Sequence, residues 1–494
     1  MHAEKSSFLA DMRWRGQIHQ ITHPAELDAH LCGGVRRAYA GFDPTADSLT
    51  IGNLVTIMAL ARFQRAGHKP IAVMGGGTGL IGDPSGKSAE RQLNTRETVA
   101  ANVKSIEKIF DRLLDFSGKP ETKAELVNNI DWLDKISYLD ALRDIGKHFS
   151  VNMMIQKDSV RERLHNRDQG ISYTEFSYMI LQSYDFLHLY RAMGVTLQMG
   201  GSDQFGNIVG GCDLIRRMTV HERSTQEQRE AIKTHLSKAQ RAIDAAKAAI
   251  DSPLQEPNEF AAAERSFERE SDMVRKVHGE FLPSDSFGLT WPLVTKSDGG
   301  KFGKTESGAI WLSAHRTSPY AYYQFWLNAA DADVVRFLKT FTFLSHDEIN
   351  AFEHKVQTEP GAREAQRALA RAATEIIHGK TDMEAAENAA KALFSGDIAS
   401  LPKQLLEDVL ASAPSSTLAK SRLAGEGVAL MDLLVETQAV ASKREAKEFL
   451  ANGSISINGT KATADHKITA SNLLHGSIVA IRRGKKNWYV TRWE

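Results

Sequence analysis

The sequence is poor in cysteine, with only Cys32 and Cys212 among its 494 residues. The two lie far apart and have neither a CxxC nor a Cys/His spacing, which argues against a disulfide framework or a zinc site and favours a reducing compartment. Long apolar runs are also missing: nowhere do about 18 apolar residues follow one another, and the residues after Met1 lack the apolar stretch of a signal peptide. We therefore expect a cytoplasmic protein without a membrane partner.

An excess of charge of either sign is missing too. Lys plus Arg and Asp plus Glu each number 61, so that the formal net charge is +0. No global field attracts the molecule to nucleic acid, and any site for a polyanion must be local. The composition, 42% hydrophobic and 25% charged, is that of a soluble globular protein. The length predicts about two to four domains, at ~100–200 residues per domain.

In the first half of the chain, short apolar segments alternate with amphipathic helices. Strands are expected at 35–42, 71–74, 126–130 and 196–199, and helices at 52–66 and 172–193. The second helix opens with Ser172 and Glu175, a capping box, and ends before Gly194. This alternation predicts an α/β fold with a parallel sheet and right-handed crossovers.

The amino-acid composition changes at 222–284, where Ala, Glu, Lys and Arg dominate. Apolar residues follow a 4-3 spacing in two runs separated by Pro253 and Pro257, which predicts an antiparallel helical hairpin inserted into the first domain, 1–317. Such a charge-rich hairpin is either a solvated spacer or a dedicated binding arm.

Two further domains are expected after the first. Residues 318–395 have amphipathic runs and few strand signals, which predicts an α-helical domain. A linker at 396–428 leads to a small α+β domain at 429–494, with a helix capped by Ser442 and two Asn-Gly turns.

The end of the chain is locally basic. From Lys443 onward ten Lys or Arg residues stand against four Asp or Glu, with Trp488, Tyr489 and Trp493 close by. This tail is either a nucleic-acid-binding surface or merely a solubilising one.

Two nucleotide-binding patterns overlap after the second strand, and neither is complete. Gly77, Gly79 and Gly82 satisfy GxGxxG, but Asp83 and Pro84 follow where a dinucleotide-binding fold needs a helix to begin. The stretch 82–88 approaches a P-loop but has one residue too few between its first glycine and Gly-Lys-Ser. We expect neither a dehydrogenase nor a Walker-type ATPase.

Two other loops are better candidates for phosphate. The segment 41–53 joins the first strand to the first helix, where exposed backbone N–H groups favour an anion. Lys301, Lys304 and Thr305 lie on a glycine-flanked loop that can close over phosphates. Taken alone, the first is equally an ordinary capped loop and the second an exposed basic turn.

A third pattern lies on the helix that begins at Ser172. Tyr178, Gln182 and Asp185 are spaced i, i+4 and i+7 and therefore share one face of an otherwise apolar helix. Because buried polar groups need partners, this polar stripe favours a binding site over plain core structure.

Together these residues resemble the signatures of the bacterial tyrosyl-tRNA synthetases, members of class I. The resembling stretches are Tyr39 with 41–49, 79–86, 174–178, 200–206 and 301–307. The likeness covers nearly the whole chain except the insertion. It implies a Rossmann-like domain for tyrosine and ATP, an α-helical anticodon-binding domain, an S4-like RNA-binding tail, and a homodimer. It further implies that L-tyrosine is activated with ATP to tyrosyl-adenylate plus pyrophosphate and then transferred to the 3′-terminal adenosine of tRNA(Tyr), with no DNA partner.

The resemblance also implies roles for single residues. Tyrosine would be bound by Tyr39, Asp83, Tyr178, Gln182, Asp185 and Gln204. ATP would be bound by Gly41, Asp43, Gly52, Asn53, Gly201, Asp203 and Lys304. Catalysis would rest on Thr45, Thr50, Asn53, Lys87, Arg91, Lys301, Lys304 and Thr305. Mg²⁺ is expected to accompany ATP, without a resident metal or a tightly bound cofactor.

One signature departs from the family. Where its members have His-Ile-Gly-His, this chain has Thr50-Ile51-Gly52-Asn53, which keeps hydrogen-bond donors but loses any imidazolium charge. A catalytically silent RNA-binding paralogue is therefore one alternative. A tryptophanyl enzyme is another, but Tyr39 and Asp185 favour a phenol, which needs a donor and an acceptor, whereas an indole needs only an acceptor.

Overall fold

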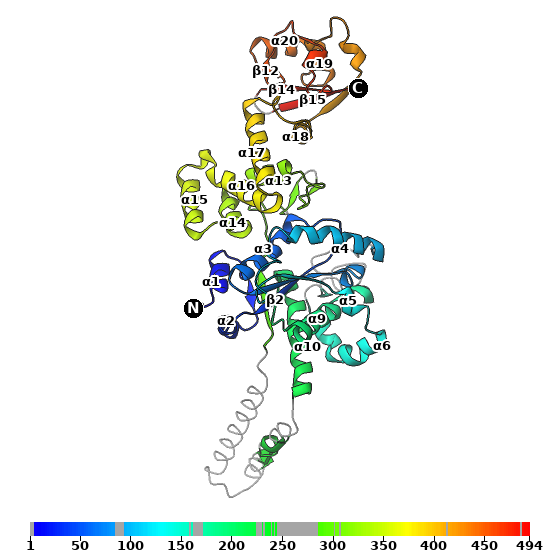
Figure 1. The fold of residues 1–494 in the computed structure, drawn as a ribbon, viewed down its shortest axis with the longest axis vertical. Helices are drawn as coiled ribbons and strands as arrows, with labels where there is room; N and C mark the ends of the chain where they lie inside the picture. The colour runs from blue at the N-terminus through cyan, green and yellow to red at the C-terminus, as the bar shows by residue number, and fades with distance from the viewer. Residues whose placement is uncertain are drawn as a thin grey trace, which may run out of the picture. The chain divides into compact units, whose positions relative to one another are not determined.

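The computed structural model describes residues 4–83, 93–157, 160–161, 171–223, 230, 233–238, 240–241, 243–244, 285–300, 302–305, 308–411, 413–484 and 487–494. Most of the expected hairpin at 222–284 lies outside these residues, as do Lys87, Arg91 and Lys301. The chain divides into two compact units, Met1–Asp47 with Thr56–Val294 and Ser48–Val55 with Thr295–Glu494 (Figure 1).

The first unit contains a six-stranded sheet in the order β1-β6-β5-β2-β3-β4. The strands are β1 Gln20–Ile21, β2 Arg37–Phe42, β3 Lys69–Met74, β4 Glu125–Asn128, β5 Leu197–Gly201 and β6 Phe287–Trp291. All neighbours are parallel except β1 and β6. The predicted parallel sheet is confirmed. Because the chain reverses its direction across the sheet between β2 and β5, a ligand crevice is expected at the carboxyl ends of these two strands.

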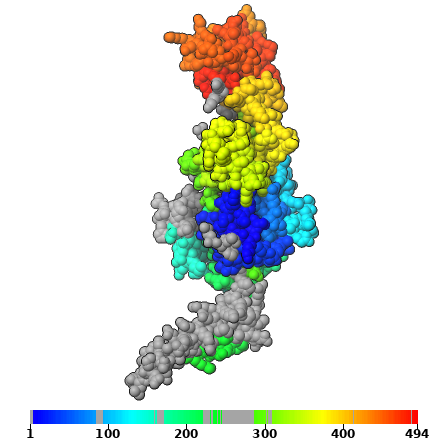
Figure 2. Space-filling model, turned by 90° about the vertical axis from the view of Figure 1, so that its left-hand side faces the viewer, coloured from blue at the N-terminus to red at the C-terminus, as the bar shows by residue number. Residues whose placement is uncertain are grey.

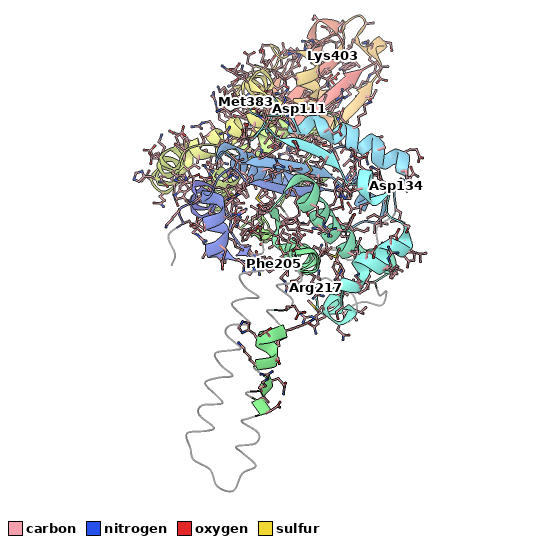
Figure 3. The ribbon with its side chains drawn as sticks, turned by 60° about the horizontal axis from the view of Figure 1, so that its bottom comes forward. Asp111, Asp134, Phe205, Arg217, Met383 and Lys403 are labelled. Carbon is pink, nitrogen blue, oxygen red and sulfur yellow. The ribbon has the colours of Figure 1, made fainter. Side chains whose placement is uncertain are left out.

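The helices of this unit are α1 Ser7–Trp14, α2 Pro24–Cys32, α3 Ile51–Arg65, α4 Arg96–Phe110, α5 Ile130–Leu133, α6 Tyr138–Asp140, α7 Val151–Ile155, α9 Tyr173–Met193 and α10 Phe205–Arg223, of which α3 starts in the second unit. α9 is the expected helix: Ser172 Oγ accepts from Glu175 N at 3.3 Å, and Gly194, with φ 64°, ends it. Side chains of α9 and α10 share one buried core with β2 and β3. Figure 3 labels Phe205 and Arg217 on α10.

In the second unit, residues 318–395 are helical, as predicted. The helices are α13 Pro319–Leu327, α14 Asp331–Phe341, α15 His346–Thr358, α16 Glu364–His378 and α17 Lys380–Ser395. A capping box of Ser345 and Glu348 starts α15. Phe302, from the expected phosphate loop, packs among the aromatic side chains of α13 and α14 and stacks on Phe341 with ring centroids 5.2 Å apart.

The C-terminal part of this unit has a five-stranded sheet in the order β12-β11-β14-β15-β9. Its strands are β9 Ser415–Leu418, β11 Ile455–Ile457, β12 Thr460–Lys461, β14 Ile478–Arg483 and β15 Asn487–Trp493, and β10 Val428–Ala429 pairs separately with β13 Lys467–Ile468. α19 Leu430–Glu436 and α20 Lys443–Ala451 pack on it. Figure 2 shows these residues, coloured orange to red, packed together as one body.

Two expectations for this region need correction. The 396–428 segment is more than a linker, because it contains α18 Lys403–Val409 and β9, which pairs in parallel with β15. Trp488 and Trp493, suggested as partners of nucleic acid, are buried, and Trp493 is only 1% exposed. In the part of the chain that the structure describes, every helix is too short or too polar to span a membrane.

Candidate active site

Polar side chains gather where the parallel strands of the first unit end. Asp43 follows β2, Thr78 comes shortly after β3, Asn129 follows β4, and Asp203 follows β5. Register pairs join Phe42 to Met74 and Met74 to Asn128, so that β2, β3 and β4 end at one level. These loops therefore meet at the carboxyl edge of the sheet.

Tyr39 and Asp185 form a deeply buried pair next to this group. Tyr39, on β2, is 2% exposed, and its ring lies 5.4 Å from that of Phe186. Asp185, on α9, is 4% exposed and accepts hydrogen bonds from Asn129 Nδ2 at 2.9 Å and Trp132 Nε1 at 2.7 Å. The Tyr39 hydroxyl has no hydrogen-bond partner among the described residues.

The pKa shifts of this pair follow from burial. Loss of solvent raises the pKa of Asp185 to about 7, although the hydrogen bonds from Asn129 and Trp132 oppose the shift. Burial and then the Asp185 carboxylate raise the pKa of Tyr39 well above its usual value. Tyr39 is therefore a neutral donor beside a carboxyl acceptor, the combination that a phenol requires.

A second group surrounds the Asp43 carboxylate. Tyr178 donates its hydroxyl to Asp43 Oδ2 at 2.9 Å, and Thr78 donates to Asp43 Oδ1 at 2.8 Å. Asn129 Nδ2 lies 3.0 Å from Thr78 Oγ1, so that a chain of hydrogen bonds connects Asp43 to Asp185. Burial, then Asp43, raises the pKa of Tyr178 well above its usual value, which keeps it a donor at neutral pH.

A third group links α9 to the loop after β5. Gln182 Nε2 donates to Gln204 Oε1 at 3.3 Å, and Asn207 Nδ2 donates to Gln182 Oε1 at 2.9 Å. Gln204 Nε2 in turn lies 2.8 Å from Asp83 Oδ2. Asp203 accepts from the same amide at 3.2 Å, and burial raises the pKa of its carboxyl.

Two positions at this edge of the sheet are glycine for different physical reasons. A Cβ on Gly75 would lie 2.2 Å from Asp43 Oδ1, so that no side chain fits beside this carboxylate. A Cβ on Gly41 would meet no atom within 4 Å, so that the backbone at the end of β2 is open to a ligand.

The second unit contains the residues expected near the ATP phosphates. Thr50 forms a β-bridge with Trp311, and Ile51 N donates to Ile310 O at 3.0 Å. Gly303, with φ 74°, lies so close to Ile51 that a Cβ would be 2.5 Å from its Cγ2. The backbone of β7 Lys304–Thr305 pairs with β8 Gly308–Ala309. Within the second unit, the end of the first predicted phosphate loop, 48–53, therefore lies beside the described part of the second, 302–305.

The expected site residues thus fall into two sets. The first unit contains Tyr39, Gly41, Asp43, Thr45, Asp83, Tyr178, Gln182, Asp185, Gly201, Asp203 and Gln204. The second contains Thr50, Gly52, Asn53, Lys304 and Thr305. Lys87, Arg91 and Lys301 lie outside the described residues.

Sequence reasoning missed several members of the hydrogen-bonded groups, namely Thr78, Asn129, Trp132 and Asn207. A usable signal existed for Asn129, because Asn128 ends β4 and Asn129 follows it at the edge where sites form. No such signal existed for Trp132, because a tryptophan shortly after a strand is typical of a hydrophobic core. Only the fold brings its Nε1 to Asp185.

The chain is similar to known proteins over its length. The family described as tRNA synthetases class I (W and Y) matches residues 34–239 and 266–395, and the one described as Tyrosine--tRNA ligase SYY-like C-terminal domain matches residues 406–491. A protein named tyrosine--tRNA ligase from Aliivibrio fischeri (strain MJ11) is 44% identical over 491 residues, 99% of both chains. One of the same name from Bacillus velezensis is 44% identical over 486 residues, 98% of this chain and 99% of the relative.

Solved structures agree with these matches. A C-terminally truncated mitochondrial tyrosyl-tRNA synthetase from Aspergillus nidulans has a TM-score of 0.61 at 28% identity and covers 79% of this chain and 95% of its own. The corresponding protein from Coccidioides posadasii has a TM-score of 0.58 at 28% identity and covers 78% and 92%.

Proposed function

The chain belongs to the tyrosine–tRNA ligases of class I, and from this membership we propose a role for each of its site residues. As such an enzyme, it activates L-tyrosine with ATP to tyrosyl-adenylate and pyrophosphate, and then transfers the tyrosine to the 3′-terminal adenosine of tRNA(Tyr). The observation that carries the choice of amino acid is the buried, unpartnered Tyr39 hydroxyl beside the Asp185 carboxyl.

We propose that the substrate's phenol donates to Asp185 and accepts from Tyr39. A buried donor left without a partner costs free energy, and only a ligand with an oxygen at this point relieves that cost. Phenylalanine has no such oxygen, and an indole N–H can donate to Asp185 but leaves Tyr39 unpaired. This favours tyrosine over tryptophan.

The other end of the substrate is assigned to the remaining hydrogen-bonded groups. Asp83, Tyr178 and Gln182 would bind the α-ammonium, since their oxygens can accept its protons, and the Gln204 amide would lie near the carboxylate. Their existing hydrogen bonds hold these side chains in place before the substrate arrives, which lowers the entropy cost of binding.

ATP binding is proposed for the residues that the resemblance assigns to it, namely Gly41, Asp43, Gly52, Asn53, Gly201, Asp203 and Lys304. Gly201 and Asp203 would contact the ribose. The open backbone at Gly41 supports this assignment.

Activation would then depend on alignment of the two substrates and on stabilisation of the charge on the phosphate oxygens. The tyrosine carboxylate attacks the α-phosphorus in line and expels pyrophosphate. Donors and cations stabilise the charge on the phosphate oxygens; these are Thr45, Thr50, Asn53, Lys87, Arg91, Lys301, Lys304 and Thr305. No general base is needed in this step, because the carboxylate is already an anion at pH 7.

We propose that Mg²⁺ enters as the ATP complex. Among the described residues no group of three or more His, Cys, Asp or Glu side chains is arranged to hold a metal. Both oxygens of Asp43 already accept hydrogen bonds, from Tyr178 and Thr78. Mg²⁺ keeps several waters and binds phosphate oxygens readily, so that it would supply charge neutralisation without protein ligands of its own.

Binding of tRNA is proposed for the helices of 318–395 and for the C-terminal domain of 429–494. Lys443 and Lys467 form ion pairs with Asp432 and Glu426, which lowers the charge that these two lysines offer to phosphates. Arg482 lies 5.4 Å from the Trp488 ring centroid and donates to Phe394 O at 3.3 Å, so that its guanidinium is already engaged within this unit. The basic surface, rather than the buried tryptophans, is the proposed contact.

A homodimer is proposed on the strength of an exposed apolar face in the first unit. We define this face by Tyr138, Leu139, Leu142, Val151 and Met153, which are exposed large apolar side chains; Leu139 is 75% exposed. Exposed apolar residues that gather in one stretch of chain are typical of an interface between subunits. The occupant that we propose is a second copy of this chain, in the cytoplasm, with neither DNA nor a membrane as partner.

Tyrosine-dependent exchange of labelled pyrophosphate into ATP tests the function. The expected result is exchange with tyrosine and none with tryptophan or phenylalanine, followed by charging of tRNA(Tyr). Binding of tRNA without exchange would instead identify a silent paralogue, and exchange with tryptophan would identify the other alternative.

A further inference from the structure

A buried carboxylate on α14 binds the beginning of the lysine loop, which we define as residues 295–305 and which the structure describes except for Lys301. Asp333 accepts from Ser297 N at 3.1 Å on each carboxylate oxygen and from Ser297 Oγ at 3.0 Å. Arg336 donates to Asp333 Oδ1 at 2.6 Å and to the carbonyl oxygen of Thr295. A buried carboxylate needs such donors, and here the loop supplies two of them.

The loop turns tightly after this carboxylate. Gly299 N donates to Lys296 O at 3.1 Å, and Gly300 N donates to Asp298 Oδ1 at 2.7 Å. Gly299 has φ 78°, a conformation that residues with a side chain rarely adopt. This segment is therefore a compact turn, and the position of Ser297 limits where the residues after it can lie.

Phe302 attaches the other end of the turn to the same helix. Its ring centroid lies 5.2 Å from that of Phe337 and 5.2 Å from that of Phe341, both on α14, and 5.9 Å from that of Phe325 on α13. Aromatic rings attract one another at such separations. α14 therefore contacts the lysine loop at two points, one on each side of the turn.

Lys304 follows this second point after a single glycine. Gly303 has φ 74°, and a Cβ on it would lie 2.5 Å from Ile51 Cγ2, so that its backbone lies directly against the start of α3. Gly303 O accepts from Ile310 N at 2.9 Å, and Lys304 pairs with Ala309. These contacts hold Lys304 from its C-terminal side, while Phe302 holds it from the N-terminal side.

We propose that Asp333 and Phe302 are positioning residues, which attach the lysine loop to α14 so that the Lys304 ammonium lies where the phosphates of ATP bind. The inference rests on the proposed function and deepens it. Neither residue contacts a substrate, because each acts through Lys304. Without the attachment to α14 the ammonium samples more positions, and a displacement of about 1 Å is enough to slow a reaction strongly. Asp333 lies outside every stretch that resembles the family signatures.

Asp333→Asn tests the carboxylate, because asparagine keeps its shape but accepts with only one of its two terminal atoms. In pyrophosphate exchange, kcat/KM for ATP is expected to fall about tenfold, the effect of one charge-assisted hydrogen bond, with the Kd for tyrosine unchanged. Asp331→Asn is the matched control: Asp331 lies in the same first turn of α14 but accepts from Gln366 Nε2 on α16, at 2.5 Å. It should stay within about twofold of the natural protein. An equal loss in both variants would overturn the proposal, since it would show only a weakened α14.

Phe302→Ala and Phe325→Ala test the second point of attachment. Both remove one ring from the same aromatic cluster and should lower the melting temperature similarly, but only Phe302 belongs to the loop. Exchange is expected to fall at least about tenfold in Phe302→Ala and to stay within about twofold in Phe325→Ala. Phe302→Leu, which restores most of the volume, should recover to within about threefold of the natural protein. Equal losses of exchange in the two alanine variants would contradict the assignment.

Phe302→Leu and Phe325→Leu replace the alanine pair if Phe302→Ala does not fold. The expected result is then an exchange rate about threefold lower in Phe302→Leu and a natural rate in Phe325→Leu. Natural rates in both would contradict the role of Phe302.

A double-mutant cycle with Lys304 separates positioning from an independent role. Lys304→Ala removes the ammonium, so that Asp333→Asn should lower kcat/KM for ATP no further in the Lys304→Ala background. A full further tenfold loss there would overturn the proposal, because Asp333 would then act without Lys304. A natural protein without any tyrosine-dependent exchange would refute the proposed function instead.

Discussion

Asn129 connects the two carboxylates of the first unit: its Nδ2 lies 2.9 Å from Asp185 Oδ2 and 3.0 Å from Thr78 Oγ1, which in turn donates to Asp43. One amide thus links the residue proposed for the phenol with the loop proposed for the nucleotide. The protonation state of the Asp185 carboxyl should therefore affect the Kd of the substrate.

Tyrosine binding should depend on pH. Because burial raises the pKa of Asp185 to about 7, this carboxyl gains a proton as the pH falls below 7 and ceases to be an anionic acceptor. The Kd for tyrosine, measured by equilibrium dialysis without ATP, is expected to rise up to tenfold per unit between about pH 7 and pH 5. Asp185→Asn should bind weakly at every pH, and a flat profile for the natural protein would exclude Asp185 as the acceptor.

Tyr39→Phe should stabilise the free protein while weakening its substrate complex. It removes a buried hydroxyl without a described partner, so that the free energy of unfolding should increase by about 1 kcal/mol, whereas tyrosine binding should lose a similar amount. Tyr178→Phe is the contrasting control: it takes the donor from Asp43 and should destabilise by about 1–3 kcal/mol. Thermal melting measures both, and equal shifts would contradict the assignment.

Trp132→Phe isolates one hydrogen bond to Asp185. Phenylalanine keeps an aromatic ring against His188, whose ring lies 4.6 Å from that of Trp132, but it lacks the Nε1 donor. Without this bond to the anionic form, the pKa of Asp185 should rise by about one unit, or about 1.4 kcal/mol. The pH below which the Kd for tyrosine rises should then be higher than in the natural protein. An unchanged pH dependence would mean that the Trp132 hydrogen bond does not oppose the effect of burial on this pKa.

Thr50→His restores the first histidine of the family signature. Because the backbone N–H of Thr50 still orients Asn53, the pyrophosphate-exchange rate should stay within about tenfold, or ~1.4 kcal/mol, of the natural protein. A far larger gain would mean that the natural sequence is an impaired site.

Leu139→Asp introduces a charge into the exposed apolar face. A buried unpaired carboxylate disfavours association, so that the variant should sediment as a monomer at concentrations where the proposal expects the natural protein to be a dimer. Phe394→Asp is the matched control, since Phe394 is 86% exposed and lies in the second unit. A dimer that survives Leu139→Asp and dissociates with Phe394→Asp would move the interface elsewhere.

Local signals predicted most of the fold. The capped ends of α9 at Ser172 and Gly194 and the wholly buried β3 can be read from neighbouring residues alone. β9 could not be found this way, because its short polar stretch Ser415–Leu418 becomes a strand only through pairing with β15. Nor does any local pattern join Ser48–Val55 to residues after Thr295, since those contacts connect parts of the chain far apart in sequence.

The roles that the resemblance implies for single site residues stay predictions. The i, i+4 and i+7 spacing identified the polar stripe of α9, and the structure adds side chains that contact it, such as Asn129 and Trp132. These contacts depend on where β4 ends relative to α9, which composition and spacing do not reveal. The suggestion that Trp488 and Trp493 contribute to a nucleic-acid-binding surface was wrong, because both side chains are buried and aromatic residues serve equally well to fill a core.

The parallel pairing of β9 with β15 limits where the C-terminal domain can be cut out for separate study. A fragment that starts at Val428 leaves the outer edge of β15 with unpaired N–H and C=O groups, a template for aggregation. A fragment that starts ahead of α18 retains the strand that covers this edge. Expression of the excised domain therefore depends on residues that precede Val428 in the sequence, because they include the strand that covers this edge.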